Sequence, residues 1–450
     1  MKKILYLLLA LVIILATAFY FLVYPKLIIV SGYAAKNMCS CVFVAGMEPD
    51  KVRQEDLNFD IIGLADVQVD SARQSVTASV FGLAPKTAYY LGPTGCALVN
   101  RMPPQAAYRY RNDWQIPYYD SLVNWYEYID TVEYLSPAQE QRLQAAVARA
   151  FEEDDPQQPR KNTRAALVLY KGQLVAEQYA PGFNKDSRLM GWSMTKSLTA
   201  STLSLLIKNG RLDPDAPTGI AAWQQDERQQ ITWQHLLHMN SGLRWQEVYD
   251  QVSDAVIMLF DSDSIGAYAM QMPSAYPPNT HWEYSSGTTN ILATAMRRYF
   301  PDNDSYVRFP YDSLFYRIGM YSLVIETDAS GAFVGSSYGW ATARDWARIG
   351  QLYLQQGNWA GVQLLDSAWV DFVQQPAPNA QGIYGGHFWL NKGRRFPDLP
   401  ADLYSLDGFQ GQKVFIIPSK ELIIVRLGLT YHEPDFDFNE WVKGIIEAVE

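Results

Sequence analysis

Cysteine is scarce in this sequence: Cys39, Cys41 and Cys96 are its only three in 450 residues. A zinc site needs three or four ligands, so Cys39 and Cys41 alone supply too few. No catalytic motif accompanies Cys96. In an exported chain two of the three can form a disulfide, but the odd number leaves one thiol over, and the sequence does not say which. We therefore expect no metal, no cofactor and no thiol nucleophile.

An excess of positive charge is also missing. The 37 Lys and Arg residues face 47 Asp and Glu residues, for a net charge of −10. An acidic surface repels phosphate backbones, so nucleic acid is not an expected partner. The sequence shows no internal repeat and no long low-complexity stretch. With 48% hydrophobic and 14% aromatic residues, the composition is that of a folded enzyme with broad apolar clefts.

One long segment near the N-terminus lacks charge altogether. The run from Ile4 to about Val23 follows Lys2 and Lys3, and about 20 apolar residues can span a bilayer. The two lysines favour a cytoplasmic N-terminus and export of the rest. We expect residues 1–24 to anchor the chain in a bacterial inner membrane, with the rest of the chain on the periplasmic, extracytoplasmic side. The alternative is a cleaved signal peptide, since Ala16-Thr17-Ala18 resembles a cleavage site.

Residues 25–134 are interpreted as an N-terminal accessory region without an assigned role. Within it, residues 67–70 and 75–80 alternate between apolar and polar side chains, which is typical of β-strands. The Pro103-Pro104 pair and the aromatic and polar residues near it indicate a long ordered linker. The remainder, residues 135–450, is expected to form one larger domain.

The domain from residue 135 is expected to begin and end with a helix and a hairpin. Ser136 is a good N-cap, and Pro137 and Gln139 complete the start of a helix that runs to about Phe151. Further expected elements are strands at 165–170 and 174–179, a helix from about Ser193 to Gly210, strands at 413–418 and 422–429, and a last helix from about Asn439. We expect the two hairpins to join in one antiparallel sheet, which defines an α+β fold.

The first candidate for catalysis is the segment from Gly191 to Ser197. Ser193 and Lys196 are three residues apart, so on a helix the amine can reach the hydroxyl. Serine needs a nearby base to become a nucleophile, and burial can lower the pKa of a lysine enough for that work. The N-terminus of a helix also offers backbone N–H groups to an oxyanion. A helix cap followed by a solvated lysine would produce the same pattern.

Two further segments carry chemistry. In the loop from Pro278 to Gly287, Tyr284 is a candidate proton relay, because a phenol near an ammonium is pushed towards phenolate. A helix is expected to follow at about residues 290–297. In the segment from Leu406 to Gln412, the glycines allow close approach of a ligand, and a backbone N–H there can complete an oxyanion hole with that of Ser193. Taken alone, each segment also has a purely structural explanation: Tyr284 can be a tyrosine packed at the edge of a loop, and the segment from Leu406 to Gln412 can be a glycine-rich turn.

Taken in this order, the three segments resemble the serine β-lactamase and penicillin-binding-protein superfamily, whose motifs begin with Ser-x-x-Lys and end with Lys-Thr-Gly. The likeness is closest to the class C branch, which uses Tyr-x-Asn and includes family VIII carboxylesterases and 6-aminohexanoate-dimer hydrolase. It covers about residues 135–450. Supporting segments are Ile231 to Leu237, Ser241 to Leu243, and Ala341 to Ala347.

The resemblance implies a fold and a set of roles. The fold is an antiparallel β-sheet flanked by helices, with a helical subdomain and Ser193 at their junction. Ser193 would attack an acyl carbon, Lys196 and Tyr284 would share the proton transfers, and the backbone N–H groups of Ser193 and Phe409 would hold the oxyanion. Water would then release the acyl group from the enzyme. Expected substrate contacts are Ser286, Asp407, Gly408 and Tyr249.

Two departures from the class C pattern bear on the substrate. Ser286 stands in place of Asn, and Leu406-Asp407-Gly408 stands in place of Lys-Thr-Gly. The site thus lacks the lysine expected to meet a β-lactam carboxylate, and Asp407 is expected to repel one. We therefore expect a small-molecule ester, amide or peptide-like substrate. The alternatives are a D-Ala-D-Ala carboxypeptidase or β-lactamase-type enzyme, and a non-catalytic cell-wall-binding relative. The oligomeric state stays open.

Other residues are less informative. His235 and His238 have the spacing of metal ligands on a helix, but their apolar neighbours indicate a core helix. A stretch that could line the cleft, or simply begin a solvated helix, contains Glu247, Tyr249, Ser253 and Asp254.

Overall fold

The computed structural model describes residues 2–114, 135–155 and 160–450. Its largest sheet has six antiparallel strands in the order β12-β13-β14-β15-β5-β6. Val425 of β15 pairs with Leu167 of β5, so the first and last hairpins join in one sheet, as the sequence predicted. The strands are β5 (Thr163–Tyr170), β6 (Gln173–Tyr179), β12 (Trp389–Leu390), β13 (Tyr404–Gly408), β14 (Gln412–Ile417) and β15 (Leu422–Gly428).

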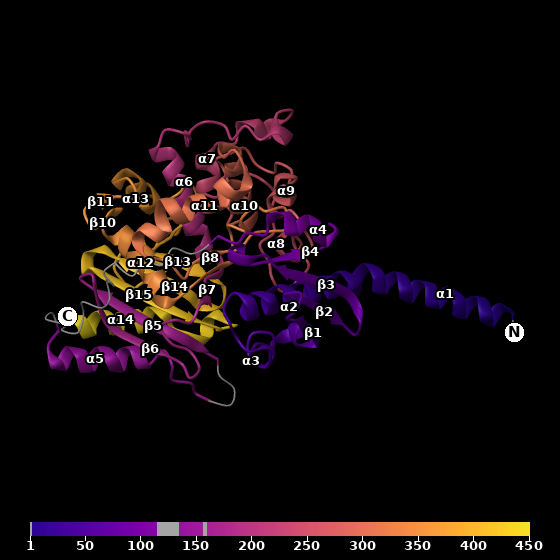
Figure 1. The fold of residues 1–450 in the computed structure, drawn as a ribbon, viewed down its shortest axis with the longest axis horizontal. Coiled ribbons are helices and arrows are strands. Elements are labelled where there is room, and N and C mark those ends of the chain that lie inside the picture. Colours follow the sequence, from indigo (N-terminus) through magenta and orange to yellow (C-terminus); the bar gives the residue numbers. More distant parts are fainter. Residues whose placement is uncertain (1, 115–134, 156–159) are drawn as a thin grey trace.

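Helices cover both faces of this sheet (Figure 1). On one face, α5 (Pro137–Ala148) and α14 (Phe438–Val449) pack in a cluster with Val168. On the other face, α12 (Ala343–Leu354) packs in the main core with Leu167. Because both faces are covered, β14 and β15 are buried along their whole length. The capping box at the start of α5 is present as predicted, although that helix ends at Ala148 rather than Phe151.

A helical subdomain lies beside the sheet (Figure 1). Its helices are α6 (Thr195–Lys208), α7 (Trp233–Leu237), α8 (Asp254–Phe260), α9 (Ile265–Met270), α10 (Ser286–Met296), α11 (Asn303–Pro310) and α13 (Ser367–Gln374). A small sheet contains β7 (Leu189–Met190), β8 (Val324–Ile325) and β9 (Gly339–Ala341), and a separate hairpin pairs β10 (Asn358–Trp359) with β11 (Val362–Gln363). This architecture confirms the predicted α+β class.

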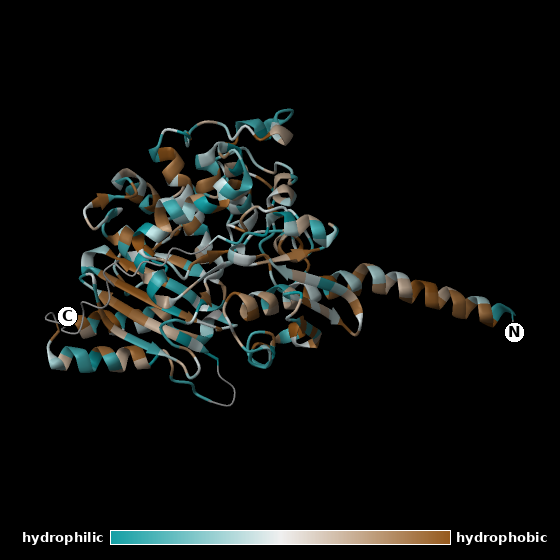
Figure 2. Ribbon diagram, viewed as in Figure 1, coloured by the Kyte–Doolittle hydropathy of each residue, from teal (hydrophilic) through white to brown (hydrophobic). Residues whose placement is uncertain are grey.

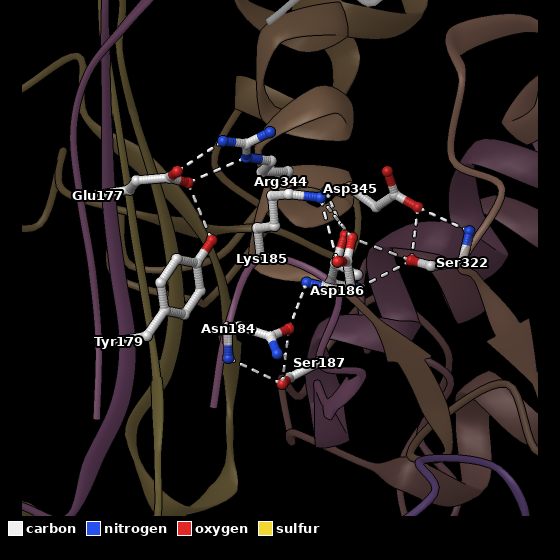
Figure 3. A network of polar contacts seen from close by, with 10 residues as sticks. Glu177, Tyr179, Asn184, Lys185, Asp186, Ser187, Ser322, Arg344 and Asp345 are labelled. Atoms are coloured by element: carbon white, nitrogen blue, oxygen red, sulfur yellow. Dashed lines mark hydrogen bonds and ion pairs between the residues drawn. The ribbon is translucent and has the colours of Figure 1, made fainter. Parts of the chain in front are cut away.

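Polar contacts fasten α12 to its neighbours (Figure 3). Arg344 donates to the Glu177 carboxylate on β6, with Nε 3.0 Å from Oε2. Asp345 accepts hydrogen bonds from the backbone N–H and the hydroxyl of Ser322, at 2.9 and 2.6 Å. The segment from Ala341 to Ala347, which supported the family resemblance, therefore has a structural role.

The N-terminal region begins with one continuous helix. It comprises α1 (Lys2–Ala18), a π turn from Phe19 to Val23, and α2 (Tyr24–Phe43). By length and composition it could cross a membrane or act as a signal sequence. No residue of α1 is buried, whereas α2 is buried from Val30 to Cys41.

A four-stranded antiparallel sheet packs against α2. Its strands are β1 (Ala65–Asp70), β2 (Ser75–Val80), β3 (Leu83–Tyr90) and β4 (Cys96–Val99), and β1 and β2 confirm the two predicted strands. Cys39 and Cys96 form a disulfide and Cys41 is a buried free thiol, which settles the pairing that the sequence left open.

The accessory region is tied to the catalytic domain by buried contacts. Lys36 of α2 forms an ion pair of 2.6 Å with Glu326, and that carboxylate also accepts from the Trp340 indole at 3.0 Å. The Tyr33 ring stacks on Trp192, one residue before Ser193. Where a linker was expected at Pro103-Pro104, the chain forms the short helix α4 (Pro104–Ala107). Residues 115–134 lie outside the described part of the chain.

Candidate active site

Ser193 lies in a tight turn that precedes α6. The 3-10 turn Trp192–Met194 leads directly into this helix, close to the predicted start. Trp192 has φ +46, a left-handed conformation that is uncommon for a non-glycine residue and costs on the order of 1–3 kcal/mol. Its indole donates to the Gln410 side chain at 3.1 Å. The contact with Gln410 therefore helps to hold the turn in this conformation. Ser193 in the turn is only partly buried.

Lys196 is buried one helical turn beyond Ser193. Its Nζ lies 2.9 Å from Ser193 Oγ, 2.9 Å from Ser286 Oγ and 3.1 Å from the Ser336 carbonyl oxygen. Burial lowers the pKa of Lys196 to about 8, against the opposing charge of Glu247. Roughly a tenth of such amines are neutral at pH 7. The structure thus brings together the two residues that the Ser-x-x-Lys pattern paired.

Tyr284 reaches the same place from the loop before α10. The Lys196 Nζ lies 4.9 Å from its ring centroid, and its ring packs 5.2 Å from that of Trp389. Burial raises the pKa of Tyr284, and a hydrogen bond with Ser193 opposes this only in part. The pKa shift is therefore away from phenolate, opposite to the expected direction, because burial and the charge of Glu247 both disfavour ionisation. Tyr284 is a neutral phenol next to Ser193.

The turn after β13 lies against the Ser193 turn. A Cβ added at Gly408 would come 2.1 Å from the Gly191 carbonyl oxygen, so the close approach requires glycine. Phe409 follows and begins the 3-10 turn Phe409–Gly411. The buried Arg426 donates to the carbonyl oxygens of Gln410 and Gly411, at 3.1 Å each. This packing holds the Phe409 turn against the turn that contains Ser193, and the rings of Phe409 and Trp192 lie 5.6 Å apart.

Glu247, which the sequence placed in a stretch that could line the cleft, makes direct polar contacts with Ser286. Its carboxylate accepts hydrogen bonds from the backbone N–H of Ser286 at 2.8 Å, from the Ser286 hydroxyl, and from the Tyr249 hydroxyl at 2.6 Å. A carboxylate is favourable at this position, the N-terminus of α10. A chain of contacts therefore runs from Lys196 through Ser286 to Glu247. Glu247 lies in a loop without a motif, so no pattern marked this contact.

Tyr249 and Phe409 form an aromatic pair near the Ser193 turn, since the Phe409 ring also packs against Trp192. Their rings stack with centroids 5.7 Å apart, and Tyr249 is 43% exposed. Of the other residues expected at the cleft, Ser253 caps α8 and Asp254 is the first residue of that helix. Only Glu247 and Tyr249 of this group contact the residues around Ser193.

The carboxylate of Asp407 contacts two cationic side chains. Its Oδ2 lies 2.6 Å from Lys413 Nζ and also contacts the Arg395 guanidinium. Burial alone would raise the pKa of Asp407, but the two positive charges outweigh it and hold the pKa at about 2. Asp407 thus lies in the site as a paired charge, and its effect on a substrate carboxylate stays a prediction. Lys413 lies directly opposite Asp407 in the β13–β14 register, a signal that strand pairing could have given.

The two histidines at helical spacing have structural positions. His235 and Thr232 form the capping box of α7. The ring of His238 stacks on Phe372 at 4.7 Å, and burial lowers the pKa of His238 to about 4. Within residues 2–114, 135–155 and 160–450, no group of three metal-ligating side chains is found.

Ser193 and the buried Lys196 lie one turn apart, at the junction of an antiparallel sheet and a helical subdomain. This arrangement is typical of the class of β-lactamase-like serine hydrolases. The family model described as Beta-lactamase matches residues 148–444. The chain therefore belongs to the Beta-lactamase family.

Individual relatives are more distant. The 6-aminohexanoate-dimer hydrolase of Paenarthrobacter ureafaciens is 24% identical over 317 residues, which cover 62% of this chain and 75% of that protein. The solved structure of a Bacillus anthracis protein assigned as a 6-aminohexanoate-dimer hydrolase has a TM-score of 0.54 at 22% identity, covering 64% of this chain and 78% of its own. A family VIII carboxylesterase gives 0.54 at 16% identity, covering 70% and 97%. At such identities the structural matches establish the fold alone.

Proposed function

We propose that this protein is an acyl-serine hydrolase that uses Ser193 as nucleophile on a small ester, amide or peptide-like substrate. One observation carries the proposal: Lys196 Nζ lies 2.9 Å from Ser193 Oγ, with the pKa of the lysine lowered to about 8. A buried amine with that pKa can accept a proton near neutral pH, whereas an exposed lysine cannot.

The proton path follows from the protonation states. The neutral fraction of Lys196 takes the hydroxyl proton as Ser193 Oγ bonds to the acyl carbon. The backbone N–H groups of Ser193 and Phe409 stabilise the resulting oxyanion. Tyr284, which its raised pKa keeps as a phenol, gives its proton to the leaving oxygen or nitrogen and regains one from the Lys196 ammonium. Water then attacks the acyl-enzyme, and Ser193 leaves with a proton.

The aromatic side chains around Ser193 favour small substrates with an apolar part. The stacked rings of Tyr249 and Phe409 and the pair of Tyr284 and Trp389 offer aromatic walls. The named relatives include a 6-aminohexanoate-dimer hydrolase and a carboxylesterase. Ester and amide cleavage by this chain is proposed on that basis, with Ser286, Gly408 and Asp407 along the substrate path.

We further propose that residues 1–24 anchor the protein in the inner membrane and that the catalytic domain is extracytoplasmic. The apolar surface of α1 is exposed along its length, and the Cys39–Cys96 disulfide is typical of an oxidising compartment.

The proposed nucleophile is tested by labelling the full chain with a fluorophosphonate probe. Wild type should be labelled, Ser193→Ala should not, and Ser71→Ala, in the exposed turn after β1, should be labelled like wild type. An unlabelled wild type favours a non-catalytic binding protein. Turnover of muropeptides or a β-lactam in preference to short p-nitrophenyl esters would move the substrate class to that of a carboxypeptidase or β-lactamase.

A further inference from the structure

The exposed apolar helix has the length of one membrane crossing. At a rise of about 1.5 Å per residue, the helical residues 2–23 span about 33 Å, close to the roughly 30 Å of a hydrocarbon core. The side chains of this segment are exposed, for example Leu7 at 71% and Phe21 at 69%. If the anchor proposed above is correct, the whole segment is used in crossing the bilayer, and Tyr24 lies at its surface.

The helix leaves no linker between this surface and the folded domain. It continues without a break into α2, where Leu27 and Ile29 pack against the core and burial is complete from Val30. Only a few residues therefore separate the membrane from buried side chains, and Figure 1 shows α1 leaving the domain on the side of β1, β2 and β3. The domain must rest on the bilayer surface.

The disulfide identifies which end of the small sheet faces the membrane. Cys39, late in α2, is bonded to Cys96, which pairs with Tyr90 at the far end of β3. The beginning of α2 therefore lies towards the opposite end of the sheet. At that end Val80 pairs with both Ala65 and Leu83.

Large apolar side chains are exposed at this same end. They are Phe81 at 78%, Leu64 at 52%, Ile61 at 50% and Leu83 at 42%. Single exposed apolar residues are ordinary, but a group of them marks a contact surface. Figure 2 shows hydrophobic colour on the β2–β3 turn beside the base of the N-terminal helix. We propose that Ile61, Leu64, Phe81 and Leu83 form a membrane-facing patch that inserts into the headgroup region of the bilayer crossed by α1.

The occupant is a lipid surface rather than a protein, because the anchor continues without a break into α2, which packs on this sheet, and so brings the bilayer to this end of it. The exposed carboxylates of Asp60 and Asp66 stand beside it. Charged groups are expensive in the hydrocarbon core, so they limit the patch to the interface. Burying such side chains would fix the tilt of the domain, which a single helix without a linker leaves undetermined.

The test uses the full chain in phospholipid vesicles and an environment-sensitive fluorophore at position 81. Phe81→Cys introduces an accessible thiol, while the native cysteines are in a disulfide or buried. The matched control is Val362→Cys, because Val362 is 48% exposed and Figure 1 places β11 on the side opposite α1. Lipids with a spin label near the headgroup serve as quencher.

The label at position 81 should be blue-shifted and quenched at least several-fold more strongly than the label at position 362. Equal quenching at the two positions in intact, embedded protein overturns the patch and leaves the anchor standing. Recovery of a chain shortened near Ala18 overturns both. Neither result affects fluorophosphonate labelling of Ser193, so failure of the hydrolase proposal is distinguishable.

Discussion

Two buried lysines, Lys36 and Lys196, show how one residue type serves two purposes in this molecule. Lys36 contacts the Glu326 carboxylate at 2.6 Å. Lys196 contacts two hydroxyls and a carbonyl oxygen, and in the described part of the chain no carboxylate oxygen forms an ion pair with it. Burial lowers the pKa of both, but only Lys36 has a counter-charge in contact. The ion pair of Lys36 with Glu326 holds α2 against the rest of the molecule, whereas Lys196 is placed to exchange a proton with Ser193.

The largest expected effect comes from removing the lysine without a counter-charge. Lys196→Ala should reduce the rate of Ser193 acylation by about 10⁴-fold, equivalent to about 5.5 kcal/mol, because the hydroxyl loses its base. The burst of p-nitrophenol from a short ester measures this rate, with circular dichroism as the check on folding. Acylation near the wild-type rate would end the distinction between the two lysines.

Lys36→Met should lower the stability of the fold and leave the acylation rate unchanged. It leaves Glu326 buried with its charge uncompensated, which costs about 3–5 kcal/mol of the free energy of unfolding. Urea unfolding measures the loss, and the acylation rate of the protein that stays folded should equal that of wild type. The double variant Lys36→Met/Glu326→Gln should regain part of the stability. A slower acylation step in folded Lys36→Met would show that α2 contributes to catalysis.

The sequence predicted those parts of the site that depend on local geometry. Ser193 and Lys196 meet because positions three apart share a helix face. The fusion of the two hairpins followed from alternation and turn residues. It did not predict that burial would raise the pKa of Tyr284, nor that Lys413 and Arg395 would reach Asp407, since both depend on tertiary packing. Lys36 gave no signal either, because one lysine in a helix looks the same whether solvated or paired.

The pH dependence of the reaction sharpens the comparison. The activity kcat/KM should rise with pH through about 8, as Lys196 loses its proton. Glu247→Gln removes a negative charge that raises this pKa, so the rise should move to lower pH. Asp254→Asn, at the start of the neighbouring helix α8, is the control and should leave the profile in place. A profile of Glu247→Gln that moves to higher pH would contradict the electrostatic role of Glu247.

The smallest expected effect concerns Asp407. Here two cations, Lys413 and Arg395, contact one carboxylate, whereas Lys196 has no carboxylate in contact. Asp407→Asn leaves the charges of Lys413 and Arg395 less neutralised at the cleft, so a substrate that bears a carboxylate should bind more tightly. The KM of a p-nitrophenyl hemisuccinate should fall about fivefold, or about 1 kcal/mol, while that of the neutral butyrate ester stays unchanged. A parallel change in both esters would mean that the substitution disturbs the β13 turn instead, since charge alone cannot alter the binding of a neutral ester.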